Sequence, residues 1–258
     1  MRFESYAQQL EDLILYCALQ HVEKSGGGGF YIDIGANDPT VDSVTKFFYD
    51  RGWHGINIEP LINRCALLAE MRPRDINLCV GLGNKRDKLN LLEYDGQSTF
   101  SQETANDGHA DFSSKPQRLK KILTLSEVHE KYCDPKQEIH FCKIDVEGFE
   151  KEVLEGIKDW EKFRPWIFVI EATLPIRADG IPCYELWEPM LFQNDYKLAF
   201  TLGGNKYYVA MEREYLLQGF SEINKFVAQN EIVIMNMYSM AAYWHNFCKM
   251  HNFDMTMK

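Results

Sequence analysis

The chain has 258 residues, of which 45% are hydrophobic and 26% charged, and its net charge is −10 at pH 7. This composition is ordinary for a globular protein, and the length suits one α/β domain with a sizeable core. The acidity, without any run of Lys or Arg, argues against a nucleic-acid partner. No stretch reaches the roughly 20 apolar residues that span a bilayer, so the sequence predicts no membrane span.

The cysteines and the N-terminus indicate the compartment. The seven cysteines are scattered and form no C-x-x-C pair, which argues for reduced thiols and against a zinc site. The first residues carry acidic side chains and lack an uninterrupted apolar core, so they do not read as a signal peptide. We therefore expect a cytoplasmic protein.

The first half of the chain alternates helical and strand patterns. Apolar residues at helical spacing predict a helix over about 7–22, and FYIDI (30–34) reads as a short buried strand. Asp38-Pro39 is a typical helix start, so a helix is expected to follow it and to end at Gly52. A strand is then expected at GINIEP (55–60) and a helix at LINRCALLAEM (61–71). Two more strands are expected, at INLCVGLG (76–83) and LNLLEY (89–94).

The second half begins with a polar stretch over about 95–117, which is expected to be a functional loop or disordered. Strands are expected at KILTL (121–125), IHFCKIDV (139–146) and WIFVIEAT (166–173), and a hairpin around Gly203-Gly204-Asn205. Helices are expected near 126–132, over 148–157, around 184–194 and in the Met-rich and aromatic-rich segment from 231 onward, which would dock on the domain or on a dimer partner.

This alternation predicts one α/β domain over residues 1–258. We expect a doubly wound, mostly parallel sheet with a C-terminal antiparallel hairpin. An N-terminal helical cap (1–25) would precede the core (26–211), and a C-terminal helical extension (212–258) would follow it.

Acidic side chains end four of the predicted parallel strands. Asp33 lies at the end of the first strand and Glu59 at the end of the second, while Asp145 and Glu171 end two later ones. Ligands of parallel sheets bind outside the carboxyl ends of the strands, so these carboxylates are expected to converge on one site. Glu59 is placed to accept hydrogen bonds from a ribose diol, as in NAD and S-adenosylmethionine sites.

The turn after the first strand separates these two cofactors. A dinucleotide fingerprint reads G-x-G-x-x-G, whereas the series from Gly35 is G-A-N-D-P-T, with Asn37 and Thr40 in place of the later glycines. S-adenosylmethionine has no phosphate but carries a sulfonium and an ammonium, which a group of carboxylates suits. Taken alone, Asp33 to Gly35 also fits a plain strand-to-helix turn with a capping Asp; joined to Glu59 and Asp145, the pattern favours S-adenosylmethionine.

Several blocks in chain order resemble the FkbM-type family of S-adenosylmethionine-dependent methyltransferases, in particular its bacterial branch associated with polysaccharide assembly. They are SYAQQLED (5–12), FYIDIGANDPTVDSVT (30–45), GWHGINIEP (52–60), STFS (98–101), KIDVEGFEKEVL (143–154), RPWIFVIEAT (164–173) and YYVA (207–210).

The resemblance implies a class I methyltransferase fold and O-methylation, commonly of a sugar hydroxyl. It also implies that Asp33, Gly35 and Asn37 lie along the cofactor, with Glu59 at its ribose and Asp145 near its methionine end. Tyr6 and Gln8 would face the same pocket.

Methyl transfer to a sugar hydroxyl needs a group that removes the proton, because the hydroxyl is a poor nucleophile. We hypothesise that Glu147 or Glu171, beside Asp145, is the base; alternatively, all three hold Mg²⁺. An i, i+4 ion pair with Lys151 is the structural alternative for Glu147, and Glu150 reads as an acid of the first helical turn.

Two other functions remain open at this point. An NAD-dependent sugar-modifying oxidoreductase would explain Glu59 but needs glycines that the first turn lacks. A non-catalytic module of a glycosyltransferase would explain the fold without chemistry. The expected partners are a sugar or glycan acceptor and either a second copy of the chain or a glycosyltransferase domain.

Overall fold

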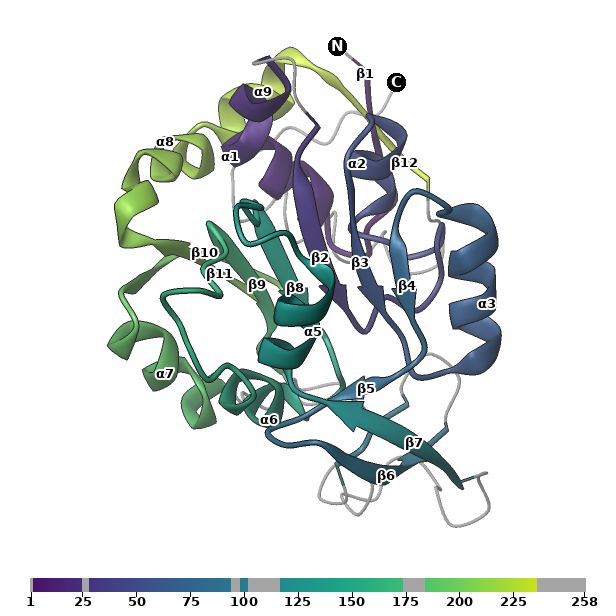
Figure 1. Cartoon of the computed structure of the whole chain (residues 1–258). Helices are drawn as coiled ribbons and strands as arrows, with labels where there is room; N and C mark the ends of the chain where they lie inside the picture. Colours follow the sequence, from purple (N-terminus) through teal and green to yellow (C-terminus); the bar gives the residue numbers. More distant parts are fainter. Residues whose placement is uncertain (1, 25–27, 94–97, 102–116, 174–183, 236–258) are drawn as a thin grey trace.

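The computed structural model describes residues 2–24, 28–93, 98–101, 117–173 and 184–235. Its largest element is a seven-stranded sheet in the order β10-β11-β9-β8-β2-β3-β4 (Figure 1). The strands, in that order, are Tyr196–Leu202, Asn205–Ala210, Ile167–Glu171, Phe141–Ile144, Phe30–Ile34, His54–Ile58 and Ile76–Leu78. The five from β9 to β4 pair in parallel, and β11 is antiparallel to both of its neighbours. The expected mostly parallel sheet and terminal hairpin are therefore present.

Two smaller sheets flank the large one. β5 (Gly81–Leu82), β7 (Gln117–Leu123) and β6 (Asp87–Leu92) form a three-stranded sheet in that order. β1 (Arg2–Ser5) and β12 (Glu231–Ile234) form a parallel pair that joins the two ends of the described chain.

Helices cover both faces of the large sheet, because alternate strand residues point to opposite sides. Tyr31, Phe141 and Val169 pack with helices α1, α2, α8 and α9, whereas Ile32 and Phe168 pack with α5, α6 and α7. The helices are α1 (Glu11–Lys24), α2 (Lys46–Asp50), α3 (Ile62–Met71), α5 (Leu125–Tyr132), α6 (Glu150–Glu155), α7 (Glu188–Gln193), α8 (Leu217–Ser221) and α9 (Ile223–Gln229), with 3-10 turns η1 (Tyr184–Leu186) and η2 (Met211–Leu216).

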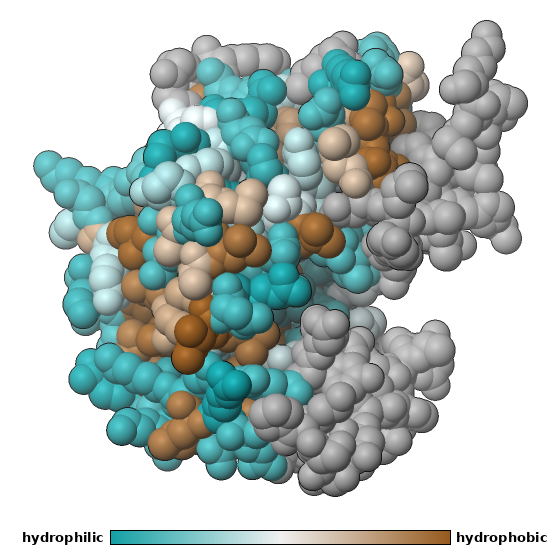
Figure 2. Space-filling view, turned by 90° about the vertical axis from the view of Figure 1, so that its right-hand side faces the viewer, coloured by the Kyte–Doolittle hydropathy of each residue, from teal (hydrophilic) through white to brown (hydrophobic). Residues whose placement is uncertain are grey.

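The outer edge of the sheet at β4 carries exposed apolar side chains. Ile62 and Met71 of α3 and Ile76 of β4 are 36–60% exposed, and Figure 2 shows an apolar area on this side of the molecule. None of the described helices is long and apolar enough to cross a bilayer.

The prediction that a helix begins directly after Asp38-Pro39 is wrong, since α2 begins only at Lys46. The Asp38 carboxylate accepts the N–H groups of Thr40 and Val41 and so forms a local turn instead of a helix cap. The buried Arg72 side chain then donates to the Pro39 carbonyl, which ties the turn to the domain.

The third strand was also expected to be continuous, but the chain leaves the large sheet after β4, and Gly81–Leu82 pairs with β7. At the C-terminal end, the helix expected from residue 231 is wrong over Glu231–Ile234, where β-branched residues form β12 on the edge of β1. Residues 236–258 and most of the polar stretch 95–117 lie outside the described residues.

The N-terminal segment is held to the domain by buried carboxylates. Glu11 is 4% exposed, and it accepts hydrogen bonds from the Gln9 N–H at 2.7 Å and from the Asn205 amide at 2.8 Å. Burial raises the pKa of Glu11 to about 7 and that of Asp12 to about 6.

We expect Glu11 to make stability fall as the pH rises from about 4.5 to about 7. Over this range an unfolded Glu loses its proton while the buried Glu11 keeps it, so the folded state binds more protons, with a maximal effect of about 3 kcal/mol. Urea unfolding at several pH values measures the free energy of unfolding. Between about pH 4.5 and 7 this free energy should fall less in E11Q than in the wild type. E127Q is the matched control, because the pKa of the half-buried Glu127 is lowered by its hydrogen bond with the Thr124 N–H, so the contribution of Glu127 is lost only in acid. If the free energy of unfolding of E11Q falls with pH as steeply as that of the wild type, Glu11 is not the group that causes the pH dependence.

Candidate active site

Carboxylates gather at the carboxyl ends of the central parallel strands. Asp33 lies in β2, Glu59 follows β3, Asp145 follows β8 and Glu171 ends β9. The register of β2 and β8 places Asp33 opposite Lys143. In the pair of β8 and β9, Ile144 lies opposite Ile170. Asp145 and Glu171 therefore end neighbouring strands. The structure thus brings the four predicted strand ends to one edge of the sheet.

The turn after β2 packs directly against the end of β8. Gly35 has φ +76°, and a Cβ at this position would lie 1.8 Å from the Asp145 carbonyl oxygen. The Gly35 N–H donates to the Ile58 carbonyl at 3.0 Å, and Asn37 also has a positive φ of 48°. Gly35 is therefore required for the contact between two loops of the site as well as for the turn.

Glu59 organises the turn from the neighbouring strand. It is 4% exposed, and its two oxygens accept the N–H groups of Asn37 at 2.8 Å and Leu61 at 2.7 Å. Burial raises the pKa of its carboxyl. Each carboxylate oxygen has a second lone pair, so Glu59 can also accept hydrogen bonds from a diol.

Lys143 is a buried cation between these carboxylates that the sequence analysis missed. Its Nζ lies 3.5 Å from Asp33 Oδ1 and 3.3 Å from Asp145 Oδ2, and it donates to the Gly35 carbonyl at 3.0 Å. Burial alone would lower the pKa of Lys143, but Asp145 and Asp33 raise it above its ordinary value, so the side chain is charged. A Lys inside the otherwise apolar strand FCKI was the available signal.

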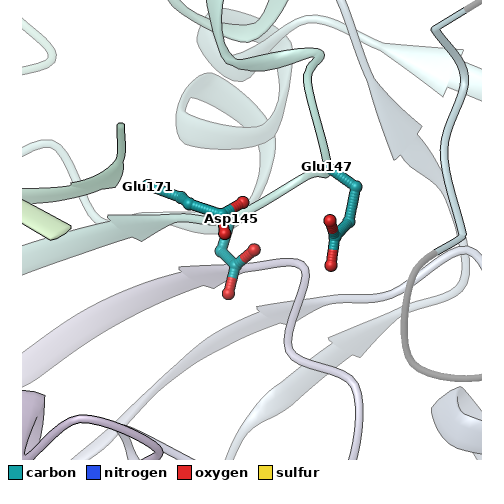
Figure 3. Close-up of side chains that lie close together, drawn as sticks. All are labelled: Asp145, Glu147 and Glu171. Atoms are coloured by element: carbon teal, nitrogen blue, oxygen red, sulfur yellow. The ribbon is translucent and has the colours of Figure 1, made fainter. Parts of the chain in front are cut away.

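Asp145, Glu147 and Glu171 form a compact group of carboxylates (Figure 3). One oxygen of each lies within 4.8 Å of the others, and Glu171 Oε2 is buried without a hydrogen-bond partner among the described residues. Burial and the negative charge of Asp145 raise the pKa values of Glu147 and Glu171 well above their usual range. No described cation lies within ion-pair distance of Glu147 or Glu171; Lys151, the alternative partner of Glu147, pairs with Glu155 at 3.9 Å.

Residues 33–198 match the family model of the methyltransferase FkbM domain. The chain belongs to this family. No curated protein matches it. The matched range contains all the acidic residues of the site and Lys143, so the site of this FkbM methyltransferase lies within the part that the family shares.

Two predicted cofactor residues of the FkbM chain, Tyr6 and Gln8, precede the matched range. Tyr6 is half-buried, its carbonyl accepts the Ser43 N–H at 3.0 Å, and Lys46 lies over its ring. Gln8 is exposed, whereas its neighbour Gln9 is buried and accepts the Gly204 N–H at 2.9 Å. The structure therefore places Tyr6 beside the start of α2 and leaves Gln8 at the surface.

Glu147 has a left-handed backbone, with φ 56°, in a loop that two neighbours hold. Glu150, the first residue of α6, accepts the N–H groups of Val146 at 3.2 Å and Gly148 at 3.1 Å, and burial raises its pKa to about 7. The Thr99 hydroxyl donates to the Glu147 carbonyl at 2.7 Å. Glu150 is the acid of the first helical turn that the sequence predicted. Glu150 and Thr99 also hold the loop that carries Glu147, a role that the sequence did not predict.

We expect Gly35→Ala to destabilise the protein more than Gly52→Ala. Both glycines have a positive φ, but a Cβ at Gly52 has no neighbour within 4 Å, whereas one at Gly35 meets the Asp145 carbonyl. G52A should cost about 1 kcal/mol from backbone strain alone, and G35A should cost at least about 2 kcal/mol because the loops must separate. Urea unfolding of both variants measures the difference, and equal losses would show that the loops do not pack as described.

Proposed function

We propose that this chain is an S-adenosylmethionine-dependent O-methyltransferase that methylates a sugar hydroxyl of a bacterial surface glycan or its precursor. The supporting observation is the charge at the strand ends, where one buried cation, Lys143, faces several carboxylates. Such an excess of negative charge suits a ligand that carries a sulfonium and an ammonium. Membership of the FkbM family supports methyl transfer, and the strand order with its two-sided core supports a doubly wound class I sheet.

In this proposal the cofactor crosses the ends of β2 and β3. Glu59 accepts hydrogen bonds from the ribose, and the turn from Gly35 to Asn37 runs along the ligand. An NAD pyrophosphate is disfavoured, because Asn37 and Thr40 stand where close backbone approach requires glycine. The Asp33–Lys143–Asp145 group would lie towards the methionine end.

Bound S-adenosylmethionine would supply the methyl group for an in-line displacement. The acceptor oxygen would bond to the methyl carbon as the carbon–sulfur bond breaks, S-adenosylhomocysteine would leave as a neutral thioether, and the hydroxyl proton would pass to a base. Glu147 and Glu171 are the proposed bases, since their raised pKa values make them better proton acceptors than ordinary carboxylates. The Asp145, Glu147 and Glu171 oxygens also fit a hard divalent cation, and Mg²⁺ held there would acidify the hydroxyl.

We expect Glu59→Gln to weaken binding of S-adenosylhomocysteine by about tenfold or more, because a charged acceptor of ribose hydrogen bonds is lost. Calorimetric titration measures the effect, with the exposed Glu70→Gln of α3 as the control. NAD should not bind the wild type. Tight binding of NAD, or no binding of S-adenosylhomocysteine, would contradict the proposed cofactor.

We expect Glu147→Gln or Glu171→Gln to lower methyl transfer by about a hundredfold or more, with S-adenosylhomocysteine binding unchanged, because a base acts only on the transfer step. The measurement is transfer of labelled methyl to a panel of sugars and oligosaccharides, with and without Mg²⁺ after dialysis against a chelator. Glu161→Gln, at an exposed acid, is the control. Full activity in both site variants would exclude them as bases. Cofactor binding without transfer to any acceptor would instead support a non-catalytic module.

A further inference from the structure

Two cysteines, Cys65 and Cys79, are in contact beside the end of β3. Cys65 belongs to α3 and Cys79 directly follows β4, and these two elements lie side by side at the right of Figure 1. The Cys65 thiol donates to the Cys79 sulfur, and the Cys79 thiol donates to the Pro60 carbonyl at 3.9 Å. The two sulfur atoms are therefore neighbours in the folded chain.

The two thiols differ in their access to solvent. Among the cysteines that the structure describes, Cys79 is the one that is exposed, whereas Cys65 is 8% exposed. Burial and the charge of a neighbouring Cys79 thiolate raise the pKa of Cys65, so Cys65 is a protonated thiol at neutral pH. A dissolved oxidant therefore meets Cys79 first, and Cys65 stands beside it as a second thiol that can resolve the oxidised sulfur.

The pair is attached to the two segments that fix Glu59. The Glu59 carboxylate accepts the Leu61 N–H at 2.7 Å, and the Leu61 carbonyl accepts the Cys65 N–H at 2.8 Å. From the other side, the Glu59 N–H donates to the carbonyl of Leu78, the residue before Cys79, at 3.0 Å. The negative charge of Glu59 also contributes to the raised pKa of Cys65, which places the two side chains close together. A bond between the two sulfurs would therefore act on the position of Glu59.

We propose that Cys65 and Cys79 form a disulfide when the protein meets a hydroperoxide, and that this bond weakens cofactor binding at Glu59. The effect on the cofactor rests on the proposed methyltransferase function, whereas formation of the disulfide does not. An S–S bond of about 2.05 Å is shorter than the contact between two separate thiols. The bond therefore draws the start of α3 towards the end of β4 and displaces the backbone that holds the Glu59 carboxylate.

The reaction balances with a hydroperoxide as the two-electron oxidant. The Cys79 sulfur attacks the terminal oxygen, the O–O bond breaks, and an alcohol (water, from hydrogen peroxide) leaves with the thiol proton, so that Cys79 becomes a sulfenic acid. The Cys65 sulfur then attacks the Cys79 sulfur, the S–O bond breaks, and water leaves with the Cys65 proton. A dithiol such as dithiothreitol returns both residues to thiols by exchange.

The first measurement maps the bond. The reduced protein is treated with hydrogen peroxide, the remaining thiols are alkylated, and the protein is digested with trypsin without a reductant. Tryptic peptides 65–74 and 75–85 carry one thiol each, so mass spectrometry distinguishes the joined peptides from the separate ones. We expect the joined peptides in the wild type and in C133S, the control at a half-buried cysteine elsewhere, but not in C79S.

The second measurement is calorimetric titration with S-adenosylhomocysteine. We expect the oxidised wild type and the oxidised C133S to bind it about fivefold or more weakly than the reduced proteins, and dithiothreitol to restore the affinity. C79S should bind equally well before and after the peroxide treatment, because its one remaining thiol of the pair has no partner.

The inference is overturned if peptides 65–74 and 75–85 are not joined in the oxidised wild type, or if either peptide is joined to another cysteine instead. Joined peptides in a protein that binds S-adenosylhomocysteine as tightly as the reduced form overturn the effect on the cofactor. If the reduced wild type does not bind S-adenosylhomocysteine at all, the proposed function fails, and the peptide map still decides whether the disulfide forms.

Discussion

The buried ammonium of Lys143 is the interaction on which the arrangement of the strand ends depends. Asp33 and Asp145 belong to neighbouring strands and are brought within 3.5 Å of the same nitrogen atom. Removing one partner of a buried ion pair commonly costs about 3–5 kcal/mol, because the remaining charge has neither water nor a counter-ion. Lys143 also donates to the Gly35 carbonyl, so the same group that balances the carboxylates fixes the turn against which they lie.

Lys143 is one end of a polar row that crosses the sheet. The register places Lys143 opposite Asp33, Asp33 opposite Asn57, and Asn57 opposite Asn77. The Asn57 amide donates at 2.9 Å both to Asn77 and to Asp75. These are charged and amide groups in otherwise apolar strands. The Lys143–Asp33 ion pair and the Asn57–Asn77 hydrogen bond join neighbouring strands, whereas Asp33 Oδ1 and Asn57 Oδ1 are buried without a hydrogen-bond partner among the described residues.

The sequence predicts those parts of the fold that depend on local pattern. Continuous apolar runs identify β2, β3, β8 and β9, and the residues that end them identify the acids of the site, because parallel strands share one carboxyl edge. Pairs distant in the sequence were not predictable in this way. β12 forms because β1 offers an open edge more than 200 residues away, and β5 leaves the large sheet because β7 offers a partner. Lys143 was missed for a similar reason, since its partners are set by strand register and not by spacing along the chain.

The N-terminal segment shows how residues outside the shared family domain support those within it. Glu11 and Gln9 accept hydrogen bonds from Asn205 and Gly204, at the turn of the β10–β11 hairpin. Asn205 lies opposite Glu171 in the register of β11 and β9, so the segment that holds the hairpin turn also supports the strand end that carries Glu171. A carboxylate with a buried, unpartnered oxygen needs such support, because its desolvation favours any movement towards water. The N-terminal segment therefore holds the hairpin turn beside the strand end that carries Glu171, although residues 33–198 contain the acidic residues themselves.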